Sequence, residues 1–299
     1  MCKGNSALDH AAKVTSKLLE DLTLKYMPLF RYFSPEDGLQ TLSTLELMVI
    51  PPKYLNDPFE GSPHIKCEDS KEFTRQKVEE LATSRDLFEE MKSVLPDYTF
   101  DQLQTDVRRS APRLREIGET LVPEVDLRIQ TEAPEIISSK WGVICFAGDE
   151  VNPLMWAHYA ESHAGLVIEF RENDPLFSGR LFFKIEYSDE PVTFDASDTT
   201  RPDDIELFLR RKSSKWINER ESRLVVELSH TIPRDTPKGR RCFIPIEPRL
   251  VISVTLGLRT PDNIKAEVVH ALQLPHFGHV ELFQIRKNVA LGALERFRI

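Results

Sequence analysis

The stretch Trp156-Ala157-His158-Tyr159-Ala160-Glu161-Ser162-His163-Ala164-Gly165, followed by Leu166-Val167-Ile168-Glu169-Phe170, carries more information than any other part of this chain. Its first eight positions hold an indole, a phenol and two imidazoles, and its last five have the character of a β-strand. A polar aromatic tip that is buried without a partner costs about 1–3 kcal/mol. A pocket wall uses such tips to orient a ligand, whereas a helix end would fill the core with the rings and satisfy His158 and Tyr159 with backbone groups. Both interpretations stay open at this point.

Signals typical of β-strands dominate the chain around and after this stretch. Apolar and β-branched runs predict strands over 141–147, 165–170, 181–187, 222–228, 241–246, 250–256 and, as the last of the fold, 280–286. Residues 261–272 have helical spacing, with Thr260 as the expected cap and Asp262 in the first turn.

The upstream part begins its β structure at 29–33. A helix should follow this strand, because Ser34 is a good N-cap, Pro35 suits the first helical position and Asp37 lies in the first turn. A second short strand is predicted over 47–50.

Residues 68–135 differ in texture, being rich in Glu, Lys, Arg, Gln and Leu with apolar residues every three or four positions. They predict about three surface helices, and residues 8–25 predict one more. Grouped helices between runs of strands predict one α+β domain over 1–299, with a mixed, mainly antiparallel β core and 68–135 as a helical insertion.

The composition is that of an ordinary globular protein, with 299 residues and a net charge of −9. This mild acidity argues against duplex nucleic acid as a partner, and no apolar run approaches the length of a membrane span. The four cysteines are far apart and form no CxxC pair, so no metal centre is expected. Single scattered cysteines favour the reducing cytoplasm as the location.

Arg31 and Tyr32 place polar groups in the middle of a short apolar strand. Because side chains alternate along a strand, the simplest interpretation turns Arg31 outward to solvent.

The segment Tyr54-Leu55-Asn56-Asp57-Pro58-Phe59-Glu60-Gly61 predicts a structural turn, since Asn and Asp satisfy nearby backbone groups. A less favoured alternative is a metal-dependent nuclease that would use Asp57, Glu60 and Glu169. It requires carboxylates that converge on one ion.

Glu219 and Glu221 open a predicted strand, whose geometry would put both carboxylates on one face about 7 Å apart. Two like charges so placed need neighbouring cations, and Lys215, Arg220 and Arg223 are the expected ones. The pair is either the charged end of a strand or a carboxylate pair that acts on an electron-poor centre.

From residue 28 to about residue 290 the chain resembles a large bacterial family of domains of unknown function, family 2971. The resemblance is carried by Leu29-Phe30-Arg31-Tyr32-Phe33-Ser34, Tyr54-Leu55-Asn56-Asp57-Pro58-Phe59-Glu60, Cys145-Phe146, Leu154-Met155-Trp156-Ala157-His158-Tyr159-Ala160, Gly165 with Glu169-Phe170, and Lys215-Trp216 with Glu219-x-Glu221-x-Arg223.

The chain is also similar, more weakly, to the ADP-ribosyltransferase superfamily. Arg31 stands where that superfamily has a His or Arg on its first strand, and Glu219-x-Glu221 stands where it has its late catalytic Glu. In place of a Ser-Thr-Ser strand this chain has Ile144-Cys145-Phe146-Ala147. The resemblance implies NAD as substrate, with Glu221, Glu219 and Arg31 as catalytic residues. It also implies a set of substrate-binding residues: Tyr32, Asn56, Asp57, Trp156, His158, Tyr159, Lys215 and Arg223.

The resulting expectation is an NAD-dependent ADP-ribosyl transferase or NAD glycohydrolase that serves in bacterial defence or as a toxin. Its partners would be a small-molecule nucleotide and a macromolecular acceptor. The alternative is a non-catalytic module that binds a nucleotide or a partner protein. All of these readings require Arg31, the rings of 156–159 and Glu221 to surround one hollow.

Overall fold

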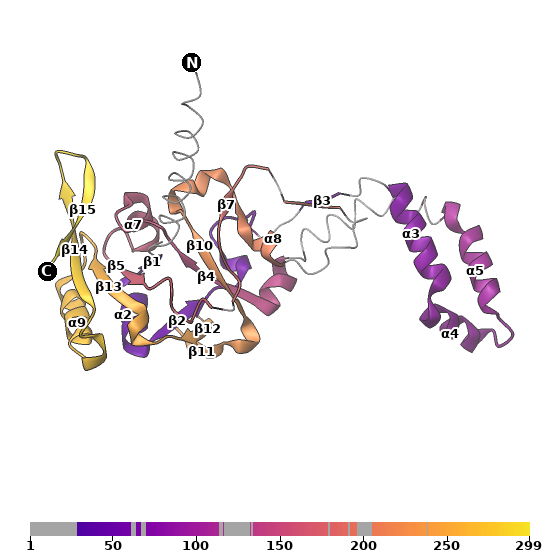
Figure 1. Cartoon of the computed structure of the whole chain (residues 1–299), viewed down its shortest axis with the longest axis horizontal. Coiled ribbons are helices and arrows are strands. Elements are labelled where there is room, and N and C mark those ends of the chain that lie inside the picture. The colour runs from indigo at the N-terminus through magenta and orange to yellow at the C-terminus, as the bar shows by residue number, and fades with distance from the viewer. Residues whose placement is uncertain are drawn as a thin grey trace, which may run out of the picture. The chain divides into compact units, whose positions relative to one another are not determined.

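The computed structural model describes residues 29–60, 64–66, 70–113, 116, 132, 134–178, 180–190, 192–195, 205–237 and 239–299. The helix predicted over 8–25 lies outside these residues. Two compact units are present (Figure 1). Unit 1 contains the described residues of 1–51, 140–187 and 212–299, and unit 2 contains those of 52–139 and 188–211.

The largest sheet of unit 1 has five strands in the order β1-β5-β13-β14-β15. These strands are β1 (Leu29–Phe33), β5 (Leu166–Phe170), β13 (Val251–Leu256), β14 (Glu281–Asn288) and β15 (Ala293–Arg298). All neighbours are antiparallel except β13 and β14, which are parallel. A parallel pair needs a crossover connection, and α9 (Asp262–Leu272) supplies it, followed by the short 3-10 helix η5 (Pro275–Phe277).

The turn from β1 into α2 (Pro35–Thr44) follows the local sequence signals. The Ser34 side chain accepts a hydrogen bond from the backbone N–H of Asp37, and Pro35 takes the first helical position. The N-cap prediction is therefore confirmed.

Unit 1 also contains two three-stranded sheets, in the orders β4-β10-β6 and β11-β12-β2. Their strands are β2 (Glu46–Val49), β4 (Trp141–Phe146), β6 (Phe182–Lys184), β10 (Ser222–Glu227), β11 (Ile232–Thr236) and β12 (Gly239–Pro245). Strand β2 pairs with β12, which lies far along the chain, so that Glu46 is opposite Pro245. Backbone bridges join Phe30 to Ala147 and Ile50 to Val143, so β1 and β2 both reach the same edge of β4.

The shorter elements of unit 1 connect these strands. They are α7 (Pro153–Tyr159), β7 (Glu186–Tyr187), η2 (Ser214–Glu219), η3 (Leu228–His230) and η4 (Pro248–Leu250). Strand β9 (Arg211–Lys212) pairs with β7, and its residue Lys212 belongs to unit 1.

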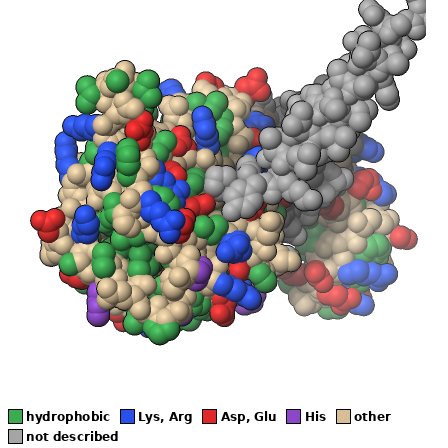
Figure 2. Space-filling view, turned by 60° about the vertical axis from the view of Figure 1, so that its left-hand side comes forward, with side chains coloured by type: hydrophobic (Ala, Val, Ile, Leu, Met, Phe, Trp, Pro, Cys, Tyr) green, Lys and Arg blue, Asp and Glu red, His purple; other side chains and the backbone are tan. Residues whose placement is uncertain are grey.

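Apolar side chains from all three sheets form the main core of unit 1. They include Leu29, Phe33, Leu47, Ile144, Leu166, Leu224 and Val254. A second cluster lies on the other face of β1 and contains Phe30, Tyr32, Met155, Trp156, Val167 and Ile285. On the face shown in Figure 2, acidic and basic side chains are interspersed with apolar ones.

Unit 2 is mainly helical over the described residues of 68–135, the segment that is rich in charged residues and leucine. Its elements are η1 (Pro52–Tyr54), β3 (His64–Lys66), α3 (Ser70–Thr83), α4 (Arg85–Val94), α5 (Phe100–Arg109), β8 (Thr193–Asp195) and α8 (Ile205–Arg210). Helices α3, α4 and α5 lie where the sequence predicted about three surface helices (Figure 1), and most of the residues 114–133 of that segment lie outside the described ones. That 68–135 is an insertion into a single domain over 1–299 stays a prediction.

The predicted α+β class with mixed, mainly antiparallel strands is confirmed. Two local expectations were wrong. The cap of α9 is Pro261 without a side-chain bond, because the Thr260 hydroxyl donates to the backbone oxygen of Gly165 instead. The strand near 280–286 is not the last, since β15 follows it. Within the described residues, no helix combines the length and the apolar character that crossing a bilayer requires.

Candidate functional site

The two glutamates singled out in the sequence lie in a tight turn rather than in one strand. Glu219 ends the 3-10 helix η2, Arg220 takes a left-handed conformation with φ 46°, and Glu221 precedes β10. The strand geometry expected for the pair was therefore wrong. The left-handed residue nevertheless turns both carboxylates toward the same cation, as the distances below show.

That cation is Lys212, whose Nζ lies 2.6 Å from Glu219 Oε2 and 3.0 Å from Glu221 Oε2. All three side chains are buried. Lys215 and Arg220, which the sequence suggested as neighbours, are exposed instead. Lys212 was missed because it stands seven residues before Glu219, and the turn that brings them together has no plain sequence signal.

Arg223 holds the second carboxylate from the other side. Its Nε and Nη2 donate to the two oxygens of Glu221 at 2.6 and 3.0 Å, and its side chain is 0% exposed. Burial alone would raise the pKa of Glu221, but Arg223, Lys212 and the Cys145 thiol together lower it to about 2. Glu221 is therefore a permanent anion at neutral pH.

Two tyrosines close the hydrogen-bonding around the pair. The Tyr159 hydroxyl at the end of α7 donates to Glu219 Oε1 at 2.5 Å, and the backbone N–H of Glu221 donates to the Tyr187 hydroxyl at 2.8 Å. Burial raises the pKa of Tyr159, and the neighbouring Glu219 raises it further. Burial likewise raises the pKa of Tyr187, to about 12. Both phenols thus stay protonated and able to donate.

The remaining rings of the opening stretch divide between core and surface. Trp156 is 0% exposed and its Nε1 donates to the backbone oxygen of Glu150 at 2.7 Å, which is the core-filling role left open above. His158 is exposed, with its ring centroid 6.3 Å from that of Tyr159. Tyr159 packs against the second cluster, and its hydroxyl bonds the carboxylate of Glu219. Tyr32 packs edge-on against Trp156 and donates to a backbone oxygen.

After α7 the chain takes an uncommon path. Glu161, Ser162 and His163 are three consecutive left-handed residues, with φ of 45°, 54° and 73°. Such residues cost of order 1 kcal/mol each and persist only where the surroundings dictate them. At the end of this turn, a Cβ on Gly165 would lie 1.9 Å from the backbone oxygen of Phe33, so only glycine fits.

Arg31 is buried, contrary to the outward orientation expected from strand alternation. Its Nη2 donates to the backbone oxygen of Met48 at 3.0 Å, which ties β1 to β2. Its Nη1 has no hydrogen-bond partner among the described residues. Burial lowers the pKa of Arg31 to about 10, although Cys145 and Asp37 oppose this effect.

The hydrogen bonds of Arg31 do not join it to the carboxylates, although the Cys145 thiol interacts with both Arg31 and Glu221. Arg31 shares a face of β1 with Leu29 and Phe33, which pack in the main core. Arg223 lies on the face of β10 opposite the core residue Leu224, and it bonds Glu221 there. The structure thus joins Tyr159, Glu219, Glu221 and Arg223, and Arg31 is not part of that hydrogen-bonded cluster.

Asn56 and Asp57 belong to unit 2 and form the predicted turn, in which Asp57 Oδ1 accepts from the N–H of Phe59 at 3.0 Å. Their predicted contact with substrate stays a prediction. Glu169, which the nuclease alternative invoked, bonds Ser253 in unit 1. Over the described residues, no three His, Cys, Asp or Glu side chains gather closely enough to hold a metal ion.

Comparison of the chain with protein-family models, with curated proteins and with solved structures finds no match in any of the three. Both family resemblances therefore stay predictions.

Proposed function

We propose that unit 1 consumes NAD, as an ADP-ribosyl transferase or an NAD glycohydrolase, at the cluster formed by Lys212, Glu219, Glu221, Arg223 and Tyr159. One observation carries the proposal, namely a pair of buried carboxylates that share one ammonium group. Glu221 is kept ionised at a pKa of about 2, and Glu219 is held by the hydroxyl of a partly exposed tyrosine.

The chemistry needs a fixed negative charge. When the bond between nicotinamide and ribose breaks, its electron pair leaves with nicotinamide and the ribose carbon becomes oxocarbenium-like. A preorganised carboxylate stabilises that charge without reorganising during the reaction. In the hydrolytic case water adds to the ribose carbon and releases one proton. We assign the stabilising charge to Glu221 and the positioning or deprotonation of the acceptor to Glu219.

Substrate would approach beside Tyr159, the least buried member of the cluster, with the exposed His158 next to it. The ring of Tyr159 then provides the stacking surface. Trp156 is engaged in the core, so we give it no contact with substrate. We also leave Arg31 outside the catalytic group, because its guanidinium donates to the backbone oxygen of Met48 and to neither carboxylate.

The test is to incubate the purified full chain with NAD and to measure released nicotinamide. We expect Glu221→Gln to reduce the rate by at least about 100-fold, as loss of a preorganised transition-state contact does. The matched control is Glu227→Gln, at the exposed far end of β10, which should keep the wild-type rate. A folded Glu221→Gln variant that releases nicotinamide at the wild-type rate would refute the assignment.

A second candidate is the non-catalytic nucleotide- or partner-binding module. It is favoured by the fact that both oxygens of Glu221 already accept hydrogen bonds and that its side chain is only 4% exposed. Calorimetric binding of NAD without any nicotinamide release, unchanged in Glu221→Gln, would favour this module over the enzyme.

A further inference from the structure

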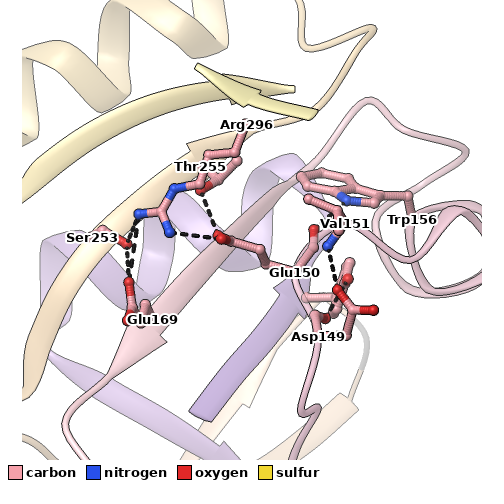
Figure 3. A network of polar contacts seen from close by, with 9 residues as sticks. Asp149, Glu150, Val151, Trp156, Glu169, Ser253, Thr255 and Arg296 are labelled. Atoms are coloured by element: carbon pink, nitrogen blue, oxygen red, sulfur yellow. Dashed lines mark hydrogen bonds and ion pairs between the residues drawn. The ribbon is translucent and has the colours of Figure 1, made fainter. Parts of the chain in front are cut away.

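Arg296 on strand β15 lies at the centre of a polar network on one face of the five-stranded sheet (Figure 3). Its Nη1 donates to Glu150 Oε1 and its Nη2 to Ser253 Oγ, each at 2.7 Å. The Ser253 hydroxyl in turn donates to Glu169 Oε2 at 2.6 Å. One guanidinium therefore connects β15 with β5, β13 and the segment that contains Glu150.

That segment, residues 148–152, joins β4 to α7 and is fixed along its length. The backbone oxygen of Glu150 accepts from the indole of Trp156 at 2.7 Å. The backbone oxygen of Asp149 accepts a hydrogen bond from the Tyr32 hydroxyl at 2.7 Å. The Asp149 carboxylate accepts a second one from the backbone N–H of Val151 (Figure 3). The position of this segment is thus set by the core on one side and by Arg296 on the other.

The same segment touches the turn that carries the glutamates. Asn152 Nδ2 donates to the backbone oxygen of Asn218 at 2.8 Å, and the N–H of Gly148 donates to that of Glu219 at 3.4 Å. A Cβ on Gly148 would lie 3.0 Å from Cβ and 3.1 Å from the backbone oxygen of Arg220. This close approach leaves the turn little freedom to shift independently of the segment.

We propose that Arg296 is a positioning residue for the Tyr159–Glu219 pair, acting through Glu150 and the 148–152 segment. Asn152 caps α7, whose last residue is Tyr159, and its amide also holds the turn of Glu219. Both members of the pair therefore rest on one segment, and Arg296 anchors it. The inference rests on the proposed function only in taking this pair as the working part of the site.

The chain contains three tryptophans, and they report on the segment, on the site and on a reference position. The indole of Trp156 donates a hydrogen bond to the backbone oxygen of Glu150 in the segment. The ring centroid of Trp216, in η2, lies 5.1 Å from Lys212 Nζ. Trp141 begins β4 and serves as the reference. Labelling the full chain with 5-fluorotryptophan gives three fluorine resonances, which single Trp→Phe changes assign.

The decisive comparison is between two arginines of β15. In Arg296→Gln we expect the resonances of Trp156 and Trp216 to move together by more than a linewidth, while that of Trp141 stays. The control is Arg298→Gln, whose partner Glu281 lies 2.9 Å away in an exposed pair, and it should move none of them. Arg296→Lys should give a spectrum between those of Arg296→Gln and the wild type, because lysine keeps the positive charge but lacks the two separate N–H groups of the guanidinium.

A second variant acts from the other end of the segment and covers the case in which Arg296→Gln fails to fold. Gly148→Ala places a methyl group against Arg220 and should move the same two resonances. A shift of Trp156 alone, in either folded variant, would overturn the proposal, because the network would then be only local. Since the measurement needs no turnover, an absence of nicotinamide release would refute the proposed function and leave this coupling intact.

Discussion

Replacing Lys212 with methionine gives the sharpest test of how the carboxylate pair is held. Methionine fills a similar volume without the charge, and the lysine side chain is only 2% exposed. Removing one partner from a buried ion pair leaves an uncompensated charge and costs about 3–5 kcal/mol. We expect Lys212→Met to lower the free energy of unfolding of unit 1 by that amount at pH 7.

The cost falls mainly on Glu219. Glu221 keeps the two-pronged contact with Arg223, whereas Glu219 keeps the hydroxyl of Tyr159, a neutral donor. A neutral hydrogen bond contributes about 0.5–1.5 kcal/mol, against about 1.5–3 kcal/mol for one to a charged group. In Lys212→Met, Glu219 therefore loses a charged contact and keeps a neutral one.

Urea unfolding followed by tryptophan fluorescence measures this effect on the right unit, because Trp141, Trp156 and Trp216 all lie in unit 1. The control Lys215→Met removes an exposed lysine of the same turn and should change stability by less than about 0.5 kcal/mol. A loss below about 1 kcal/mol in Lys212→Met would refute this account of the pair.

Two further predictions follow from the same geometry. Although burial opposes ionisation, the Arg223 fork helps to lower the pKa of Glu221 from 4.5 to about 2. The ionised form therefore stabilises the fold above about pH 4.5, and roughly 3 kcal/mol is lost as the pH falls toward 2. Urea titrations across this range should show a steeper loss in the wild type than in Glu221→Gln, and parallel curves would contradict the assignment. Gly165→Ala should destabilise unit 1 by about 3 kcal/mol or more, because the new Cβ would meet the backbone of Phe33 at 1.9 Å. Gly278→Ala, with no atom closer than 3.6 Å to the new Cβ, should stay within about 0.5 kcal/mol of the wild type, and equal effects in urea melts would disprove the steric argument.

Local signals were enough for the elements that depend on neighbouring residues. The start of α2 was predictable because Ser34 and Pro35 act within one turn of the helix. Strand β15 was missed because Glu295, Arg296 and Arg298 interrupt its apolar pattern, and its pairing with β14 rather than its own sequence makes it a strand. Strand existence was thus predictable where apolar residues alternate or run together, and not where an edge strand is charged.

The site was predictable in its residue types and not in its assembly. The sequence identified Glu219, Glu221, Arg223 and Tyr159, but the left-handed Arg220 that gathers the carboxylates has no sequence signature. Buried lysines are rare, so Lys212 gave no reason to be chosen over its exposed neighbours. Arg31 was expected to face solvent because strand alternation describes one strand alone. It does not show that β1 and β2 meet beside β4, where Arg31 bonds the backbone of Met48. The local turn at Arg220 decided the first two outcomes, and the contact between two strands decided the third.

The pairing of β2 with β12 also constrains how the protein folds during synthesis. Glu46 must wait for Pro245 before β2 can form its ladder with β12, and at about 5–20 residues per second the ribosome needs roughly 10–40 s to supply it. Through that interval an apolar strand with free backbone groups is exposed to other nascent chains. Holding chaperones, slow-codon placement and expression temperature should therefore affect the yield of this protein more strongly than changes in its surface residues.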